Sequence, residues 1–275
     1  MIRKKRNLNH MKDESKLKKI VKETYGKIAS GRRKSCCGSR CSCDVLNSKS
    51  VMSEDYDSLK GYNPDADYGL GCGLPTKFAK IKKGDTVIDL GSGAGNDCFI
   101  ARAEAGETGR IIGIDFTPEM IKKAKANVKK LGFTNVEFVQ GDIDNMPLES
   151  NLADVIVSNC VLNLVPNKEA VFKEIYRVLK PKGHFSISDI VLTGKLPKKI
   201  RSVASMYAGC VSGAVDKDIY LKHIRETGFK KIVIQKEKTI VIPDEDLQAH
   251  LSDKEIALYK KDLNIIKSIT VYAEK

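Results

Sequence analysis

The chain has few of the features that mark membrane or secreted proteins. Its 275 residues include no tryptophan, and aromatic residues make up only 6% of them. No apolar run approaches the ~18 residues that a membrane-spanning helix needs. The basic N-terminus, MIRKKR, is followed by neither an apolar core nor a small-residue cleavage site, so it does not predict a secretory signal. These absences favour a cytoplasmic protein without a membrane partner.

The net charge is strongly positive, but its pattern does not predict a nucleic-acid partner. The formal charge is +13, a surplus that suits an anionic partner in principle. The lysines are spread along the whole chain, however, and aromatic residues are not interleaved with them as they are on surfaces that stack bases. We therefore interpret them as residues of solvated helix faces.

Cysteine is abundant, with eight residues. A chain of this length builds a core without disulfides, so a disulfide scaffold is not expected. Reduced thiols are more often metal ligands or reactive groups. Half of them lie within residues 35–43, at Cys36, Cys37, Cys41 and Cys43. A structural zinc site is an alternative for these four, but their spacing suits a tetrahedral site poorly.

The middle of the chain alternates between short apolar runs and helical patterns. Five runs predict strands, at residues 86–90, 110–115, 136–140, 153–158 and 184–191. Three segments between them predict helices, at residues 97–105, 117–131 and 168–179. This alternation predicts parallel strands joined by crossovers. The expected fold class is α/β, a doubly wound and mostly parallel seven-stranded sheet.

Both ends of the chain add further elements. Leu17, Ile20, Val21, Tyr25 and Ile28 recur at helical spacing and predict a short amphipathic helix before the cysteine-rich stretch. After the fifth strand we expect two helices, at residues 192–207 and 218–227, and then a strand at 230–241. A helix at 245–259 and a last strand at 268–272 follow.

A glycine-rich turn follows the first predicted strand. Residues 89–95 read DLGSGAG, and Asp115 ends the second strand. Glycines there let the backbone turn tightly and approach a ligand at the carboxyl edge of the sheet. A carboxylate at the position of Asp115 accepts hydrogen bonds from ribose hydroxyls. The spacing departs from the dinucleotide fingerprint, and Asp89 suits a cationic sulfonium and amino group better than a pyrophosphate.

This turn, Asp115 and the Gly141–Asp142 pair together resemble the class I S-adenosylmethionine-dependent methyltransferases over about residues 86–191. The resemblance implies that Asp89 and two glycines surround the methionine part, that Asp115 holds the ribose and that Phe116 packs on the adenine. Asp142 would accept from the adenine amino group, although a simpler role as a turn cap is the alternative. The implied cofactor-binding residues are Asp89, Gly91, Ser92, Gly93, Gly95, Asp115, Phe116, Asp142, Ile143 and Asn159.

Three further cysteines lie in glycine-bearing or strand-end segments that are able to face one cleft. Cys72 precedes the predicted sheet, Cys160 follows the fourth strand, and Cys210 lies near a helix end. Soft thiolates bind soft centres, and trivalent arsenic is one. Thiol-bound arsenic keeps a lone pair that can attack an electrophilic methyl group without a general base. Cys98, on the first helix of the sheet domain, is interpreted as a small buried hydrophobic residue.

At this point the chain resembles the arsenite methyltransferases, over about residues 35–239. The similarity depends on YGLGCG at 68–73, DLGSGAGND at 89–97, SNCVLNL at 158–164 and YAGC at 207–210. It implies arsenic(III) binding by Cys160 and Cys210, and our own hypothesis adds Cys72 as a third arsenic ligand. It also implies that Cys72 forms a disulfide with an N-terminal cysteine and so returns oxidised arsenic to the trivalent state. One departure is Leu74, where the family usually has Asn.

The resemblance also implies partners and a division of the chain. Arsenite would arrive as a thiol conjugate, and thioredoxin or glutathione would reset the enzyme. All four N-terminal cysteines compete as the partner of Cys72, and we favour the pair Cys41 and Cys43, which is nearest the domain. We expect a monomer with an N-terminal helix and cysteine-rich loops at 1–75. A cofactor-binding domain at 76–192 and an arsenic-binding C-terminal extension at 193–275 would follow.

Three other functions compete with arsenic methylation. A methyltransferase for a small organic acceptor, such as a quinone precursor, would share the cofactor site but leaves Cys72, Cys160 and Cys210 unexplained. A thiol-based metalloid-binding protein without turnover would not need the intact cofactor set. A nucleic-acid methyltransferase usually pairs a polar residue with Pro-Pro and an aromatic residue after the fourth strand, whereas residues 158–162 read SNCVL.

Overall fold

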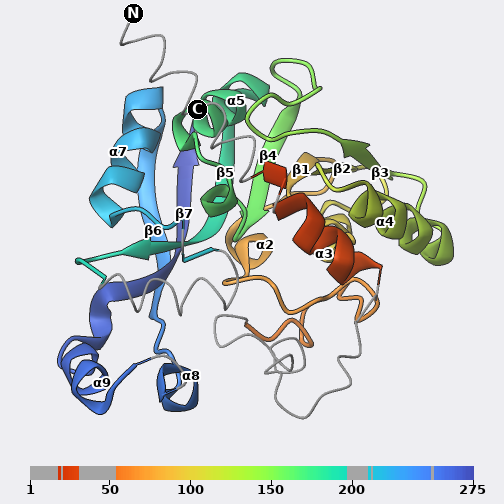
Figure 1. Ribbon diagram of the computed structural model, residues 1–275. Coiled ribbons are helices and arrows are strands. Elements are labelled where there is room, and N and C mark those ends of the chain that lie inside the picture. The colour runs from red at the N-terminus through yellow and green to blue at the C-terminus, as the bar shows by residue number, and fades with distance from the viewer. Residues whose placement is uncertain (1–17, 20, 31–53, 197–209, 212, 249–250) are drawn as a thin grey trace, which may run out of the picture.

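A seven-stranded sheet of order β3-β2-β1-β4-β5-β7-β6 forms the centre of the molecule (Figure 1). The computed structural model describes residues 18–19, 21–30, 54–196, 210–211, 213–248 and 251–275. Strands β1 to β5 pair in parallel, and β7 is antiparallel to both of its neighbours. The predicted mostly parallel α/β fold is therefore confirmed. The strands are Thr86–Leu90, Arg110–Asp115, Val136–Gln140, Ala153–Asn159, Leu179–Leu192, Lys230–Thr239 and Ile266–Glu274.

Helices cover both faces of this sheet because its central strands are apolar on both sides. Residues of α3 (Asn96–Ala105) and α4 (Pro118–Leu131) pack with Val87 and Val155 on one face. Residues of α5 (Lys168–Val178) and α7 (Lys217–Thr227) pack with Ile88 and Ile156 on the other. The short helix α2 (Pro75–Phe78) contacts β4 and β5. Gly132, in a left-handed conformation, ends α4 as its sequence predicts.

Two predicted elements differ from the structure. The fifth strand begins at Leu179, so Pro181 and Gly183 lie within it and not in a loop. Its register with β4 shifts between Ala153 and Val155, and such a bulge accommodates a proline and a glycine in a strand. The helix expected at 245–259 is two helices, α8 (Asp244–Gln248) and α9 (Asp253–Tyr259), because Ser252 begins α9 with a capping box. The helix expected at 192–207 falls largely outside the described residues.

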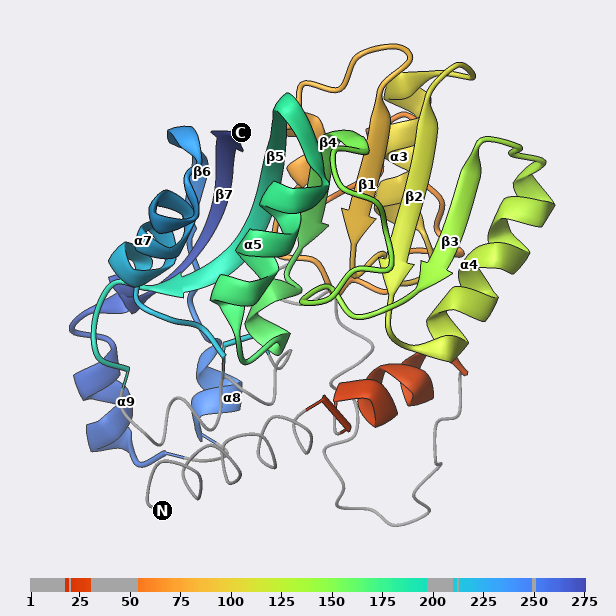
Figure 2. The same ribbon diagram turned by 90° about the horizontal axis from the view of Figure 1, so that it is seen from above.

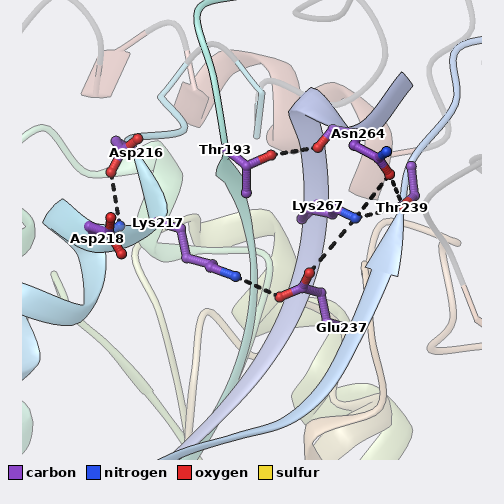
Figure 3. Close-up of polar contacts among 8 residues, drawn as sticks. All are labelled: Thr193, Asp216, Lys217, Asp218, Glu237, Thr239, Asn264 and Lys267. Carbon is purple, nitrogen blue, oxygen red and sulfur yellow. Dashed lines mark hydrogen bonds and ion pairs between the residues drawn. The ribbon is translucent and has the colours of Figure 1, made fainter. Parts of the chain in front are cut away.

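A polar network links strands β6 and β7 to α7, and Thr193, which follows β5, donates to the Asn264 carbonyl (Figure 3). Glu237 of β6 lies 2.9 Å from the Lys217 ammonium of α7 and 3.7 Å from that of Lys267 in β7. Lys267 also donates to Thr239 at 2.8 Å. These strands come from the segment expected as an extension, yet they complete the same sheet as β1 to β5. Strands β6 and β7 are therefore part of one sheet with β5.

Several segments gather beyond the carboxyl ends of the parallel strands. The helix formed by residues 18–19 and 21–29 lies there beside β1 to β4, and α8 and α9 lie beyond β5 (Figure 2). Ligands bind at this edge in open α/β sheets. None of the helices that the structure describes is long and apolar enough to cross a membrane.

Candidate active site

The glycine-rich turn after β1 forms the floor of a pocket at this edge. Gly91 has φ +68°, and a Cβ there would lie 2.4 Å from the Val161 side chain, so only glycine fits. The amide of Gly93 donates to the Asp115 carboxylate at 3.0 Å, whereas nothing lies within 4 Å of where its Cβ would be. The Ser92 hydroxyl is buried without a partner among the described residues. This open, polar cradle suits a ligand.

Most of the predicted cofactor-binding residues line one pocket. The turn contributes its floor, β2 contributes Asp115 and Phe116 follows it, and the segment after β3 provides the far wall. The predicted residues that line the pocket are Asp89, Gly91, Ser92, Gly93, Asp115, Phe116, Asp142, Ile143 and Asn159.

Gly95 is the predicted cofactor residue that does not line this pocket. It has φ +102° at the start of α3, and a Cβ there would lie 2.7 Å from the Phe138 ring and 2.9 Å from that of Phe99. Its place in the sequence motif therefore reflects packing of α3 on the sheet and the turn itself. Thr117 occupies the N-cap position of α4 without a side-chain capping bond, and its backbone amide donates to Asp115 at 2.8 Å.

Buried carboxyl groups give one end of the pocket its electrostatic character. Burial raises the pKa of Asp89 well above its ordinary value, and the neighbouring Asp97 raises it further. Burial also raises the pKa of Asp97 to about 6, although Asn159, Tyr56 and Thr76 donate hydrogen bonds to it. No ion pair in the described part of the chain involves either acid. Such a site favours a ligand with a positive charge.

Asp97 was not among the predicted site residues. It follows the glycine-rich turn at the start of α3, and the DLGSGAGND motif includes it. Tyr56, from the segment before the sheet, donates to Asp97 at 3.0 Å and to the Gly73 carbonyl at 3.2 Å. Asp97 could have been predicted from its place at the end of the motif. Its partner Tyr56 could not, because it comes from a stretch with no motif.

The N-terminal helix covers the other end of the pocket. Lys18, Val21 and Tyr25 of this helix line it. The Lys18 ammonium lies 2.9 Å from Asp144 and 3.4 Å from Asp142. Asp142, which is expected to accept from the adenine amino group, therefore lies next to the Lys18 ammonium. The helical spacing predicted this helix, but not where it packs.

Three thiols form a buried cluster beside the pocket. Cys72, Cys160 and Cys210 are 0%, 3% and 0% exposed and pack in one apolar cluster. All three are free thiols. The Cys210 thiol donates to the Cys160 carbonyl at 3.0 Å. Burial raises the pKa of Cys72 and of Cys160, and the neighbouring thiols raise that of Cys160 further. The convergence expected of these three cysteines is present.

Local geometry fixes the thiols in place. Cys160 follows β4 with φ +61°, a conformation that costs a residue other than glycine about 1–2 kcal/mol. Its amide donates to the Ser188 carbonyl at 2.8 Å, which anchors this turn to β5. Next to Cys72, a Cβ on Gly73 would lie 2.5 Å from the Ser188 hydroxyl, so glycine lets the Cys72 loop approach β5. Both cysteines are therefore held against the same strand.

Asn159 connects the cluster to the pocket. Its carbonyl oxygen accepts from the Cys72 amide at 2.9 Å, while its amide nitrogen donates to the Gly73 carbonyl at 2.8 Å and to Asp97 at 3.3 Å. The same nitrogen contacts the Tyr56 hydroxyl. Cys160, the next residue, lines the pocket and belongs to the thiol cluster. The two parts of the site therefore meet at the end of β4.

A buried carboxylate beside the thiols was missed from the sequence. An oxygen of Asp189 and the sulfur atoms of Cys72 and Cys160 all lie within 4.8 Å of one another. Asp189 accepts from Asn163 at 2.8 Å and from Tyr220 at 3.3 Å. Burial raises its pKa to about 7, against the effect of Lys168. Asp189 sits in the apolar run of β5, where nothing in the sequence marks it as a site residue.

The C-terminal helices close the cluster off. Leu247 of α8 and Ile256 and Tyr259 of α9 pack in the same apolar cluster as the three thiols. Leu247 is fully buried. The remaining predicted site cysteines, Cys41 and Cys43, lie outside the described residues, as do Cys36 and Cys37. Cys98 is fully buried, as expected, and its thiol lies 3.3 Å from an oxygen of Asp89.

Comparisons with known proteins agree with this geometry. Residues 81–228 match the family model described as a methyltransferase domain. The arsenite methyltransferase of Halobacterium salinarum is 40% identical over 88% of this chain and 65% of its own length. That of Aquipseudomonas alcaligenes is 35% identical over 85% of this chain and 68% of its own length. The chain belongs to the arsenite methyltransferase family.

A solved structure supports the same family membership. The crystal structure of an arsenic(III) S-adenosylmethionine methyltransferase from Chlamydomonas reinhardtii is 32% identical, with a TM-score of 0.63. The match covers 74% of this chain and 67% of that one. The chain spans about two thirds of the length of the curated family members that it matches.

Proposed function

We propose that this protein transfers methyl groups from S-adenosylmethionine to thiol-bound trivalent arsenic. The observation that carries the proposal is the placement of Cys160. It lines the pocket below the glycine-rich turn and packs in one buried cluster with Cys72 and Cys210. A methyl donor in the pocket and a soft acceptor on the thiols would therefore meet at the end of β4.

The pocket suits S-adenosylmethionine in charge and shape. Asp89 and Asp97 are buried acids at one end, where a cationic amino group and sulfonium would lie. The Ser92 hydroxyl, which has no partner among the described residues, and the Asp115 carboxylate offer hydrogen bonds to polar groups of the ligand. Phe116 and Ile143 supply apolar surface for an adenine ring. When bound, the cofactor would supply an electrophilic methyl group and leave as a neutral thioether.

The residues of the chain hold the acceptor and exclude water. Three thiolates satisfy trivalent arsenic and leave its lone pair free, so no general base is required. Each thiol gives up its proton when it replaces a thiol or hydroxide already bound to arsenic. That proton leaves with the displaced group, as a free thiol or as water. Because α8 and α9 cover the cluster, the arsenic would be shielded from solvent during transfer.

We infer that Cys72 also takes part in the redox step. Methyl transfer leaves arsenic in the pentavalent state, and two thiols return it to the trivalent state by forming a disulfide. We propose Cys41 or Cys43 as the partner of Cys72, with Cys160 and Cys210 keeping the arsenic for a further methylation. Thioredoxin or glutathione would then reduce the disulfide. Monomeric chains in a reducing cytoplasm would suit this cycle and its role in arsenic detoxification.

An arsenic-speciation assay tests the proposal. Purified protein is incubated with arsenite, S-adenosylmethionine and a thioredoxin or glutathione system, and methylated products are separated and quantified. We expect methylated arsenic from the unaltered protein. The Cys160→Ser variant should fall to the level without enzyme while it keeps its affinity for S-adenosylmethionine, measured by calorimetry.

The matched control is Cys98→Ser. This cysteine is also fully buried but donates to Asp89 outside the thiol cluster, and serine keeps a donor at that position. The control should remain active. Methylation by Cys160→Ser would contradict the proposal, and cofactor binding without any methylated arsenic would point to a small organic acceptor.

A further inference from the structure

The thiol cluster has one member that arsenic chemistry does not use. Trivalent arsenic is satisfied by soft thiolates, whereas Asp189 contributes a hard carboxylate oxygen. This oxygen and the sulfur atoms of Cys72 and Cys160 lie within 4.8 Å of one another, and all three residues are buried. Within the described parts of the chain, no other set of three potential metal-binding side chains is so close.

We propose that Cys72, Cys160 and Asp189 bind a thiophilic divalent cation, such as zinc or cadmium, in place of arsenic. Zinc–sulfur and zinc–oxygen bonds of roughly 2.3 and 2.0 Å place the ligand atoms of a tetrahedral site about 3.5–3.8 Å apart. Because the three atoms lie within 4.8 Å of one another, they need to approach by no more than roughly 1.0–1.3 Å, within the reach of side-chain rotation. The Cys210 thiol donates to the Cys160 carbonyl and lies beside this set.

The surroundings of Asp189 hold its carboxylate as they would a metal ligand. Asn163 donates to one oxygen at 2.8 Å, as does the Ile190 amide at 3.0 Å. Tyr220 donates to the other oxygen at 3.3 Å, a long bond that leaves a lone pair of this oxygen free. Hydrogen bonds of this kind orient ligands and tune affinity at metal sites. Asp189 is thus preorganised for coordination from the β5 side.

The charges of the site balance with a divalent ion. Two thiolates and one carboxylate carry three negative charges, and a divalent cation with the nearby Lys168 ammonium offsets them. Burial lowers the pKa of Lys168, and the neighbouring Asp189 and Cys210 partly oppose that effect. Binding releases the proton of each coordinating thiol to solvent, and no atom changes its oxidation state. The consequence is competition with arsenite and not with S-adenosylmethionine.

This inference rests on the same cluster as the proposed function but is tested separately. The full chain, with Cys36, Cys37, Cys41 and Cys43 replaced by serine to remove other thiols, is titrated with Co²⁺ under reducing conditions. We expect thiolate-to-cobalt charge-transfer absorption that zinc abolishes by displacement. One equivalent of arsenite added first should also prevent it. Absence of the charge-transfer bands would overturn the proposal.

A substitution separates the cation from arsenic. In Asp189→Asn the zinc affinity, measured by competition with a chelator, should fall roughly tenfold or more, as losses at metal sites do. Arsenite binding, measured by equilibrium dialysis, should stay within about threefold, which is less than 1 kcal/mol. Zinc affinity unchanged in a folded Asp189→Asn variant would overturn the role of this residue.

Two further arms keep the result interpretable. If Asp189→Asn does not fold, as judged by circular dichroism, the Cys160→Ser variant replaces it and should lose the cobalt signal. Arsenic methylation by the unaltered chain, with and without added zinc, is measured in parallel. Metal binding without methylation would contradict only the proposed function. Methylation that zinc leaves unaffected would contradict only the proposed metal site.

Discussion

The cofactor pocket and the thiol cluster lie side by side but are built in opposite ways. The pocket is formed largely by turns that follow β1, β2 and β3 in order. One of its polar groups, the Ser92 hydroxyl, has no hydrogen-bond partner among the described residues. The cluster draws single residues from the loop before the sheet, from the end of β4 and from the C-terminal third. Its walls are apolar, and its chemistry comes from sulfur. The pocket therefore suits a charged ligand, whereas the thiol cluster excludes water around a soft one.

This difference means that the two regions depend on different parts of the chain. The pocket needs the parallel strands and the helix at residues 18–19 and 21–29. The cluster also needs α8 and α9, which make no contribution to the pocket lining. Changes in the C-terminal helices should therefore alter the affinity for arsenite and leave the affinity for the cofactor unchanged. Changes near the glycine-rich turn or the N-terminal helix should do the reverse.

The largest expected effect comes from Leu247 of α8. This side chain is fully buried against the thiol cluster, so Leu247→Ala should cost about 3–5 kcal/mol of unfolding free energy, through lost burial and a cavity. Arsenite binding should weaken with it, whereas the affinity of the folded protein for S-adenosylmethionine should not change. Urea unfolding and calorimetry measure the two quantities.

Leu258 of α9 offers a matched control. Its side chain is 62% exposed, so Leu258→Ala removes the same atoms without leaving a cavity and should change stability little. If Leu247→Ala weakened cofactor binding as strongly as arsenite binding, the pocket and the thiol cluster would not be independent.

A second effect tests the buried acid of the pocket. The pKa of Asp97 is about 6 in the folded protein, against an ordinary value of 3.8. The folded state therefore holds the proton more tightly, and its stability falls as the pH rises from about 4 to 6. The full difference is about 3 kcal/mol for a shift of about 2 units. Asp97→Asn should remove this loss, so its advantage over the unaltered protein should grow through this window.

Unfolding free energies at several pH values between 4 and 7 measure this trend. Asp65→Asn is the control, because Lys130 lowers the pKa of this exposed carboxyl group, which is the opposite direction. Parallel stability curves for Asp97→Asn and the unaltered protein would contradict the account of the pocket as a buried acidic site.

The same contrast explains what the sequence revealed. The pocket could be predicted because one contiguous motif carries its turn, and spacing along the chain places Asp115 and Asp142 beyond it. The three cysteines were found because thiols are rare and chemically distinctive. Asp189 was missed because a lone acid in an apolar strand has no pattern until Asn163 and Tyr220 are known to surround it. Tyr56 and Tyr25 were missed as site residues because only packing brings them to the pocket.

The smallest expected effect concerns the contact between the N-terminal helix and the pocket. Partial burial works against the charge of Lys18, but Asp144 and Asp142 outweigh it and raise its pKa. Because these groups are partly exposed, the contact is worth at most about 1 kcal/mol. Lys18→Ala should loosen the helix that places Val21 and Tyr25 in the pocket, and so weaken S-adenosylmethionine binding by at most roughly fivefold. Calorimetry measures the change in affinity for S-adenosylmethionine, and the affinity for arsenite should stay the same.

The neighbouring Lys19 provides the control for this last change. It is an exposed residue of the same helix, so Lys19→Ala removes an equal charge without touching Asp142 or Asp144. A loss of affinity confined to Lys18→Ala would show that the helix is part of the cofactor site. Tighter binding by Lys18→Ala would mean instead that Lys18 competes with the adenine amino group for Asp142. In that case the N-terminal helix would oppose cofactor entry, and the pocket would share the closed character of the thiol cluster.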